Sequence, residues 1–182
     1  MKKIIWITLI FISLTTSLLT TSCQEKFPME NEKLDSMELL LDQSKEYLNI
    51  DIELISARSL ELGEQRNFID QNYKDTFTMN FGRQLDMHRT VFKSYNRAIQ
   101  EHKKWNAELE ALSKQIETLR YSLNQGEMSS TEFRNFYNNE RLDILALHAG
   151  SEQLKTGLYE LEPLYQRSVE YFDLVIEDLR KD

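Results

Sequence analysis

Apolar residues recur along the last third of the chain at an alternating spacing of three and four positions. The row comprises Phe133, Tyr137, Ile144, Leu147, Leu154, Leu158, Leu161, Tyr165, Phe172, Val175 and Leu179. Its only polar members are Glu140, Ser151 and Ser168. Residues at this spacing lie on one face of an α-helix, and a sustained row of them is typical of the seam of a coiled coil. The pattern therefore predicts one long helix over the last third.

The same rhythm runs through the rest of the chain. The row in the middle third comprises Leu85, His88, Phe92, Tyr95, Ile99, His102, Trp105, Leu109, Leu112, Ile116, Leu119 and Leu123. In the first third, apolar residues recur every seven positions at Leu34, Leu41, Leu48, Ile55 and Leu62. We therefore expect an all-α fold of three long helices.

The boundary between the second and third predicted helices is marked by residues that end and begin helices. Asn124, Gln125 and Gly126 end the second helix. Ser129, followed three residues later by Glu132, matches a capping box. The third helix should therefore begin directly after Ser129.

Two other places leave an alternative open. Residues 76–81 (TFTMNF) alternate like a strand, but a lone strand has no partner, and Phe77 and Phe81 extend the helical row, so we expect helix there. Pro163 lies within the last row without shifting its phase. We expect a kinked continuous helix despite a local cost of about 3 kcal/mol, and a four-helix bundle broken at Pro163 is the alternative.

The helix lengths predict an elongated antiparallel bundle. The first helix, residues 32–62, would be about 45 Å long, whereas the other two would each reach about 75 to 80 Å. It could then cover only residues 72–104 and 150–181, which would leave residues 105–148 as a projecting two-helix hairpin. Residues 23–53 hold nine acids and three bases, and residues 83–104 hold six bases and two acids, so these stretches would be complementary neighbours.

The N-terminal segment has the pattern of a secretory signal. Lys2 and Lys3 precede an apolar run from Ile4 to Ile12, and a Ser/Thr/Leu stretch follows up to Cys23, the one cysteine of the chain. The segment resembles the signal of bacterial lipoproteins, in which a peptidase cuts before a lipid-modified cysteine. Thr20 stands where an apolar residue is usual, as in the relaxed signals of Bacteroidota lipoproteins.

The resemblance implies a signal peptide over residues 1–22, a lipidated tether over 23–31 and one helical coiled-coil domain over 32–182. Cys23 would carry fatty acid such as palmitate and hold the protein on the membrane. Gln24 follows the cysteine where aspartate would imply retention at the inner membrane, so the resemblance implies the outer membrane, on its periplasmic or surface face. An uncleaved membrane anchor and ordinary secretion are the alternatives.

Composition excludes one class of partner. Removal of residues 1–22 leaves 160 residues with 20 bases and 30 acids, a net charge of −10. A chain this acidic repels phosphate backbones, so we expect no nucleic-acid binding. Its length suits one domain, and its few glycines and prolines favour a few long elements.

The sequence offers little chemistry. His88 and His102 lie fourteen residues apart, about 21 Å along a helix, too far to share a metal. His148 could approach His102 near Glu101, but polar seam residues that fix the register are the favoured interpretation. The di-iron motif and phosphate-binding glycine loops are lacking, and an acylated Cys23 cannot act as a nucleophile. We therefore expect no catalytic residues, no metal site and no cofactor, and no enzymatic activity.

One stretch is a candidate surface for a partner. In FRNFYNNERL, residues 133–142, Phe136 lies beside the seam and Asn135, Asn138 and Asn139 lie on outer faces, in a helix that asparagine disfavours. Together with Met128 in the preceding loop they could contact a partner. A solvated face with one partly exposed aromatic ring is the simpler interpretation.

These observations predict a membrane-anchored coiled-coil lipoprotein that acts as a structural or adaptor component of the bacterial cell envelope. Its partner would be another envelope protein or a second copy of itself. The alternative is an inhibitor or accessory subunit that binds one envelope enzyme, transporter or secretion machine.

Overall fold

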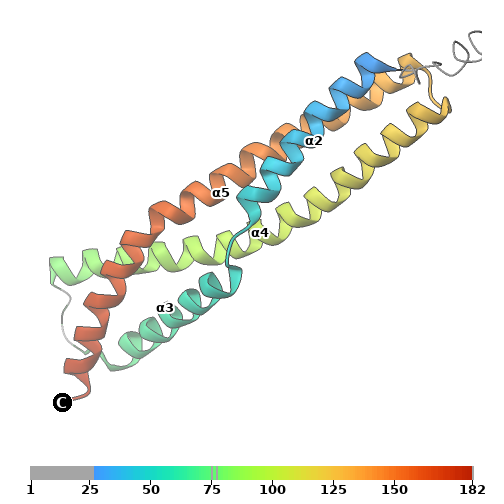
Figure 1. Ribbon diagram of the computed structural model, residues 1–182. Helices are drawn as coiled ribbons and strands as arrows, with labels where there is room; N and C mark the ends of the chain where they lie inside the picture. Colours follow the sequence, from blue (N-terminus) through green and yellow to red (C-terminus); the bar gives the residue numbers. More distant parts are fainter. Residues whose placement is uncertain (1–26, 75, 77, 182) are drawn as a thin grey trace, which may run out of the picture.

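The computed structural model describes residues 27–74, 76 and 78–181, and this part of the chain is helical apart from short connections. The helices are α2 (Pro28–Leu48), α3 (Ile52–Asn72), α4 (Met79–Gln125) and α5 (Ser130–Leu179) (Figure 1). Because no strand occurs within the described ranges, the all-α prediction is confirmed. No helix there is long and apolar enough to cross a membrane. The predicted signal peptide and Cys23 lie outside the described residues.

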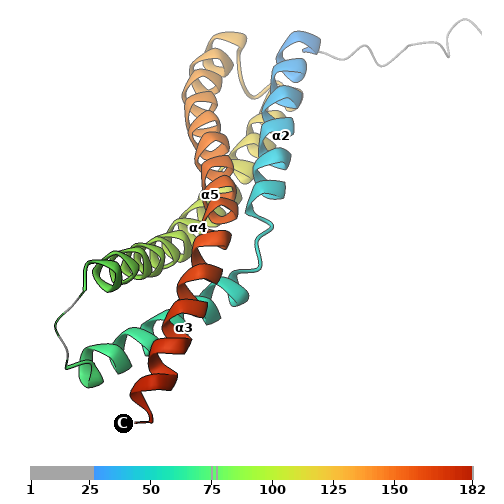
Figure 2. The ribbon, with the colours of Figure 1, turned by 90° about the vertical axis from the view of Figure 1, so that its left-hand side faces the viewer.

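The two longest helices form an antiparallel hairpin, and the two shorter ones lie along it in succession (Figure 1). α2 packs against both α4 and α5 beside the turn that joins them. α3 continues in the same direction and also packs against both. Figure 2 shows that the N-terminal half of α4 and the C-terminal half of α5 diverge beyond their crossing.

The prediction of one continuous first helix over residues 32–62 is wrong, because the helix is interrupted at residues 49–51. Asp51 caps the start of α3 by accepting a hydrogen bond from the backbone N–H of Leu54 at 3.0 Å. The imidazole Nε2 of His102 lies 3.0 Å from the carbonyl oxygen of Leu48, so it satisfies the end of α2. Both helix ends at the break are thereby hydrogen-bonded.

The apolar row nevertheless continues through this break. Leu34, Leu41 and Leu48 of α2 and Ile55 and Leu62 of α3 are all buried. The row extends to Ile69, because α3 ends at Asn72 rather than at residue 62. A single heptad pattern of buried apolar residues therefore extends over two helices, α2 and α3.

Residues 73, 74, 76 and 78 are not helical, so the expectation of helix over residues 76–81 is wrong at 76 and 78. α4 begins at Met79, and the Thr78 hydroxyl caps it by accepting from the backbone N–H of Phe81. Phe77 lies outside the described residues.

The projecting two-helix hairpin is also wrong, because α2 and α3 together extend along the whole hairpin. The side-chain amide of Asn31 donates to Asn124 at the turn end, at 3.2 Å. At the opposite end Gln65 donates to Asp173 at 2.8 Å. Asp35 and Glu38 of α2 pair with Arg120 and not with the basic stretch 83–104, whose residues Val91 and Tyr95 pack against α3.

The end of α4 and the start of α5 match the sequence prediction. Gly126 adopts the left-handed conformation at φ 75°, and its N–H bonds the Leu123 carbonyl oxygen. Ser129 and Glu132 form the capping box. α5 continues through Pro163, so the alternative of a bundle broken there is wrong.

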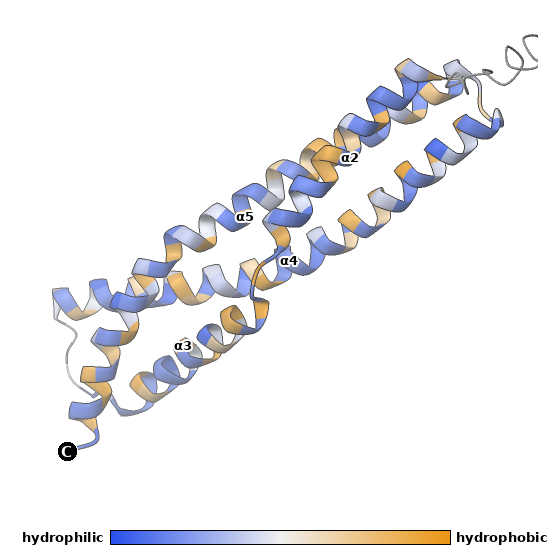
Figure 3. Ribbon diagram, viewed as in Figure 1, coloured by the Kyte–Doolittle hydropathy of each residue, from blue (hydrophilic) through white to orange (hydrophobic). Residues whose placement is uncertain are grey.

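The core consists of three clusters in succession along the bundle. The turn-end cluster includes Leu34, Leu41, Ile116, Leu123, Phe133 and Leu147. The central cluster includes Ile55, Leu62, Val91, Tyr95 and Tyr165, and the far-end cluster includes Ile69, Phe81, Leu85, Phe172 and Ile176. Figure 3 shows apolar and polar residues alternating along every helix, as helices that bury one face require.

Candidate interaction surface

α4 and α5 enclose an open groove that neither α2 nor α3 lines. The groove has a volume of about 700 Å³ and is lined by residues 94–105 of α4 and 149–164 of α5. Its apolar lining includes Trp105, Leu158, Leu161 and Leu164. Since α2 and α3 fill the other side of the hairpin, this groove lies where a fourth helix would pack.

The floor of the groove depends on a glycine. A Cβ added at Gly150 would lie 2.4 Å from Cζ2 of the Trp105 indole, far inside van der Waals contact. The absence of a side chain at Gly150 therefore lets the indole lie against the α5 backbone. The ammonium group of Lys104 lies 3.9 Å from the centre of the same ring, a cation–π distance.

Large apolar side chains flank the groove on a second row of α5 positions. Ala149, Glu152 and Thr156 line the groove, and the same three-four spacing continues to Leu145 and Leu142 in one direction and to Tyr159 in the other. Leu142 is 64%, Leu145 38% and Tyr159 82% exposed. Within α5, this row places large apolar side chains in solvent beside an open groove.

The rim of the groove is acidic. Arg97 pairs with Glu101 within α4 at 3.5 Å. Glu152 and Glu160 are exposed on α5, and neither forms an ion pair within the described part of the chain. An apolar strip with unpaired carboxylates at its edge has the chemistry to bind an amphipathic helix that carries basic side chains.

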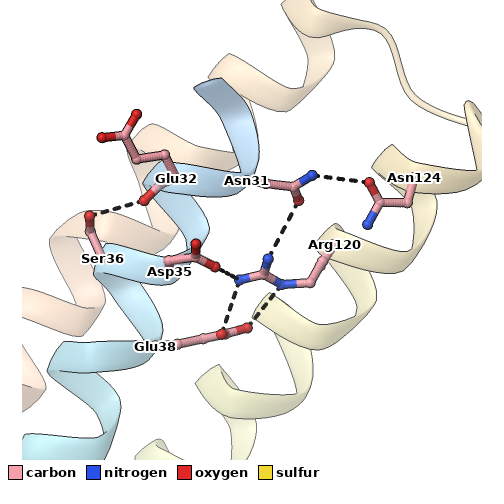
Figure 4. Close-up of polar contacts among 7 residues, drawn as sticks. All are labelled: Asn31, Glu32, Asp35, Ser36, Glu38, Arg120 and Asn124. Atoms are coloured by element: carbon pink, nitrogen blue, oxygen red, sulfur yellow. Dashed lines mark hydrogen bonds and ion pairs between the residues drawn. The ribbon is translucent and has the colours of Figure 1, made fainter. Parts of the chain in front are cut away.

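Arg120 of α4 holds the start of α2 in place (Figure 4). Its Nη2 lies 2.7 Å from an Asp35 oxygen and 3.0 Å from a Glu38 oxygen, and its Nε donates to Glu38 at 3.1 Å. Asn31, only 2% exposed, accepts from Arg120 and donates to Asn124. This network, named here the Arg120 clamp, fixes α2 to the C-terminal end of α4.

A second polar cluster joins α3 to α5. Arg58 forms a two-point ion pair with Glu162, and its guanidinium lies 4.6 Å from the centre of the Tyr165 ring. The Tyr165 hydroxyl donates to Glu61. Burial raises the pKa of Tyr165, and the bond to Glu61 adds to the shift. These groups bond one another, so they serve helix packing and present no free nucleophile.

His88 is fully buried in the seam near the far-end cluster. Its Nε2 lies 3.2 Å from the side-chain oxygen of Gln65, whose amide donates to Asp173. Burial lowers the pKa of His88 to about 4, and the positive charges of Arg66 and Arg89 act in the same direction. His88 is therefore neutral at pH 7.

The other histidines also serve helix packing. His102 bonds the end of α2, as described above, and contacts Asn106. His148 bonds Gln43 and lies edge-on to Tyr47, with the ring centres 5.5 Å apart. In the described ranges no group of three or more His, Cys, Asp or Glu side chains has the arrangement of a metal site.

The predicted partner residues lie on the first turns of α5 and in the turn before it. Phe136 is 52% exposed, and Asn135, Asn138 and Asn139 are exposed around it. Met128 is half-buried against the turn-end cluster. None of these residues lines the groove. The sequence reasoning missed Leu142, Leu145 and Tyr159, although their three-four spacing beside the main row was readable.

Comparison with known proteins adds no relative, because no family model, no characterised protein and no solved structure matches the chain. The groove and its rim are therefore the described features from which a function can be proposed. The groove supports binding of a partner. The polar clusters, by contrast, hold one helix to another.

Gly150→Ala should destabilise the domain by about 1 to 3 kcal/mol, because the added methyl group overlaps the Trp105 ring. Gly157→Ala, one heptad further along α5, is the matched control, since a Cβ there meets nothing within 4 Å. It should be stabilising by up to about 1 kcal/mol through helix propensity. Urea unfolding gives both values. Tryptophan fluorescence of the chain without residues 1–22 reports on Trp105 alone, because the other tryptophan, Trp6, lies in the predicted signal peptide. Equal effects at both glycines would contradict the close contact.

His88 should make stability depend on pH. Its pKa is about 4 in the folded chain against an ordinary value of 6.5, so the unfolded chain binds the proton first as pH falls. The contribution is complete above about pH 6.5 and is lost progressively as the pH falls through 4, about 3 kcal/mol in all, of which about 2 kcal/mol is lost between pH 7.5 and 4.5. Urea unfolding at pH 7.5 and 4.5 measures it.

The matched variants are His88→Gln, which keeps a hydrogen-bonding group without titration, and His102→Gln in the same helix. The first should lose about 2 kcal/mol of the difference in unfolding free energy between the two pH values. The second should retain that part. An unchanged pH difference in His88→Gln would show that His88 is not held neutral by burial.

Proposed function

We propose that this chain is a membrane-anchored coiled-coil lipoprotein of the bacterial cell envelope and acts as an adaptor. Fatty acid on Cys23 holds it on the outer membrane. Its groove binds an amphipathic, basic helix of another envelope protein. The observation that carries the adaptor role is the open groove of about 700 Å³ with its exposed apolar edge.

The shape of the groove supports a helical occupant. It follows two helices over residues 94–105 and 149–164, so it is a long channel and not a closed pocket. An amphipathic helix uses residues three, four and seven positions apart to fill such a channel. Leu142, Leu145 and Tyr159 extend the apolar contact along the same line.

Charge favours a foreign partner over a second copy of this chain. Glu152 and Glu160 have no basic partner of their own among the described residues. A second copy packed groove to groove would bring an equally acidic rim against them, whereas lysine or arginine on a partner helix would compensate them. An inhibitor or accessory subunit of one envelope machine is the second candidate, and it differs in having a single stoichiometric target.

A binding role is proposed in preference to an enzymatic one. Arg58, Glu61, Glu162 and Tyr165 bond one another, and His88 is buried against Gln65. Catalysis needs an acid, base or nucleophile that can reach a substrate. The groups named above are already bonded to one another between helices, which supports binding.

Lipidation is tested in cells with a fatty-acid label. The protein with Cys23 should incorporate the label and fractionate with membranes, because the thiol forms the acyl bond. Cys23→Ser should do neither, and Ser22→Ala serves as the control that changes the neighbouring residue only. Label on the Cys23→Ser protein would rule out the assignment.

The adaptor role is tested by photo-crosslinking in intact cells. A crosslinking residue at Leu142 or Tyr159 should capture one protein other than this chain. The same residue at Leu60, which is 65% exposed on α3, a helix that contributes nothing to the groove, is the matched control for Leu142 at 64%. The control should give no such product.

Charge reversal identifies the rim as part of the same surface. Glu152→Lys with Glu160→Lys should reduce the crosslink severalfold because a basic partner is repelled. Glu46→Lys, an exposed acidic position on α2, should leave it unchanged. A product made of two copies of this chain, or equal yields at Leu142 and Leu60, would contradict the proposal.

A further inference from the structure

We propose that the α4–α5 turn faces the bilayer and that the bundle stands away from it, which presents the groove about 30 Å or more above the membrane surface. The inference rests on the proposed lipidation of Cys23. It adds which end of the bundle lies near the membrane, and at what height a partner helix meets the groove.

First, the length of the chain between Cys23 and α2 limits how far α2 can lie from the bilayer. Five peptide units separate Cys23 from Pro28, the first residue of α2. A chain spans at most about 3.6 Å per residue, so Pro28 lies within about 18 Å of the lipidated residue in any conformation. The start of α2 is therefore held close to the bilayer.

The second step is the attachment of α2 to the hairpin. The Arg120 clamp joins Asp35 and Glu38 of α2 to α4, and Asn31 bonds Asn124, two residues before the turn glycine Gly126 (Figure 4). Leu34, which is fully buried, packs in the turn-end cluster. The α4–α5 turn therefore lies beside the start of α2, at the end of the bundle that is held near the bilayer.

The third step is the distance along the helices. α5 has 50 residues, so its far end lies about 75 Å from the turn at 1.5 Å per residue. Gly150 is 20 residues beyond Ser130, about 30 Å from the turn, and Leu164 is about 50 Å from it. The groove therefore occupies the middle of the rod, and the connection between α3 and α4 lies at the far end.

Charge and exposed side chains favour an upright rod over one lying on the lipid. The mature chain carries 20 bases and 30 acids, so a rod lying flat would bring more net negative charge to anionic headgroups than one standing on its end. At the turn end, Met29 is 69%, Tyr121 60% and Phe136 52% exposed. Apolar and aromatic side chains of this kind partition into the bilayer interface. Phe136 and its asparagine neighbours then lie near lipid instead of a protein partner.

The test measures energy transfer from single dyes to labelled headgroups in vesicles that carry the lipidated full chain. Because the thiol of Cys23 is acylated, one introduced cysteine is the single labelling site. Each variant replaces one exposed residue: Glu127→Cys at the turn, Thr156→Cys at the groove or Lys181→Cys at the far end. Transfer should be highest at residue 127, intermediate at 156 and severalfold lower at 181.

The outcomes separate the two claims. Fatty-acid labelling and flotation of the same samples report lipidation. If the chain is not acylated, the proposed function and this orientation both fail. If it is acylated but transfer is equal at residues 127 and 181, or is higher at 181, the orientation alone is wrong. Circular dichroism of each labelled variant verifies that the helices are intact.

Discussion

The structure depends on the burial of apolar side chains. α4 and α5 pack against each other, and α2 and α3 each bury one apolar row against this hairpin. Leu34, Leu62, Ile144, Leu147 and Phe172 are almost wholly removed from water. Burial of such a side chain contributes about 1.5 to 3 kcal/mol, and no disulfide shares the task, because the chain has a single cysteine. The same requirement explains the open groove: at each level of the bundle only α2 or α3 packs against α4 and α5, and the face that α4 and α5 turn away from them stays uncovered.

Polar contacts act at the places where this packing leaves the register undetermined. A row of leucines tolerates a shift by one heptad, whereas the Arg120 clamp and the Arg58–Glu162 pair each match one residue on one helix to one on another. The clamp sets where α2 begins relative to the α4–α5 turn. Exposed ion pairs contribute little to stability, so their main effect is on alignment. The proposed orientation on the membrane follows from that alignment.

The sequence predicted the buried rows and the helix ends that are marked by capping or helix-ending residues. The buried rows, the Ser129–Glu132 capping box and the passage of α5 through Pro163 could all be read from the chain. The break at residues 49–51 could not be read from periodicity, because Leu48 and Ile55 remain seven residues apart across it and both stay buried. The mistaken projecting hairpin has a different cause: the first helix was expected to end at residue 62, whereas α3 continues to Asn72. The groove was missed because the Gly150–Trp105 contact joins residues 45 positions apart, which no local pattern reveals.

The most direct test of this account is the distance between the start of α2 and the α4–α5 turn. Spin labels at Glu32→Cys and Gln125→Cys, in the domain with Cys23 replaced by serine, can be measured by pulsed electron resonance. Packing of α2 along the whole hairpin predicts one short, narrow distribution below about 25 Å, two helix diameters. If α2 instead lay beside residues 72–104, residue 32 would face residue 104 and the distance would be about 30 Å or more. A population at the longer distance would contradict the three-helix packing from which the groove and the membrane orientation both follow.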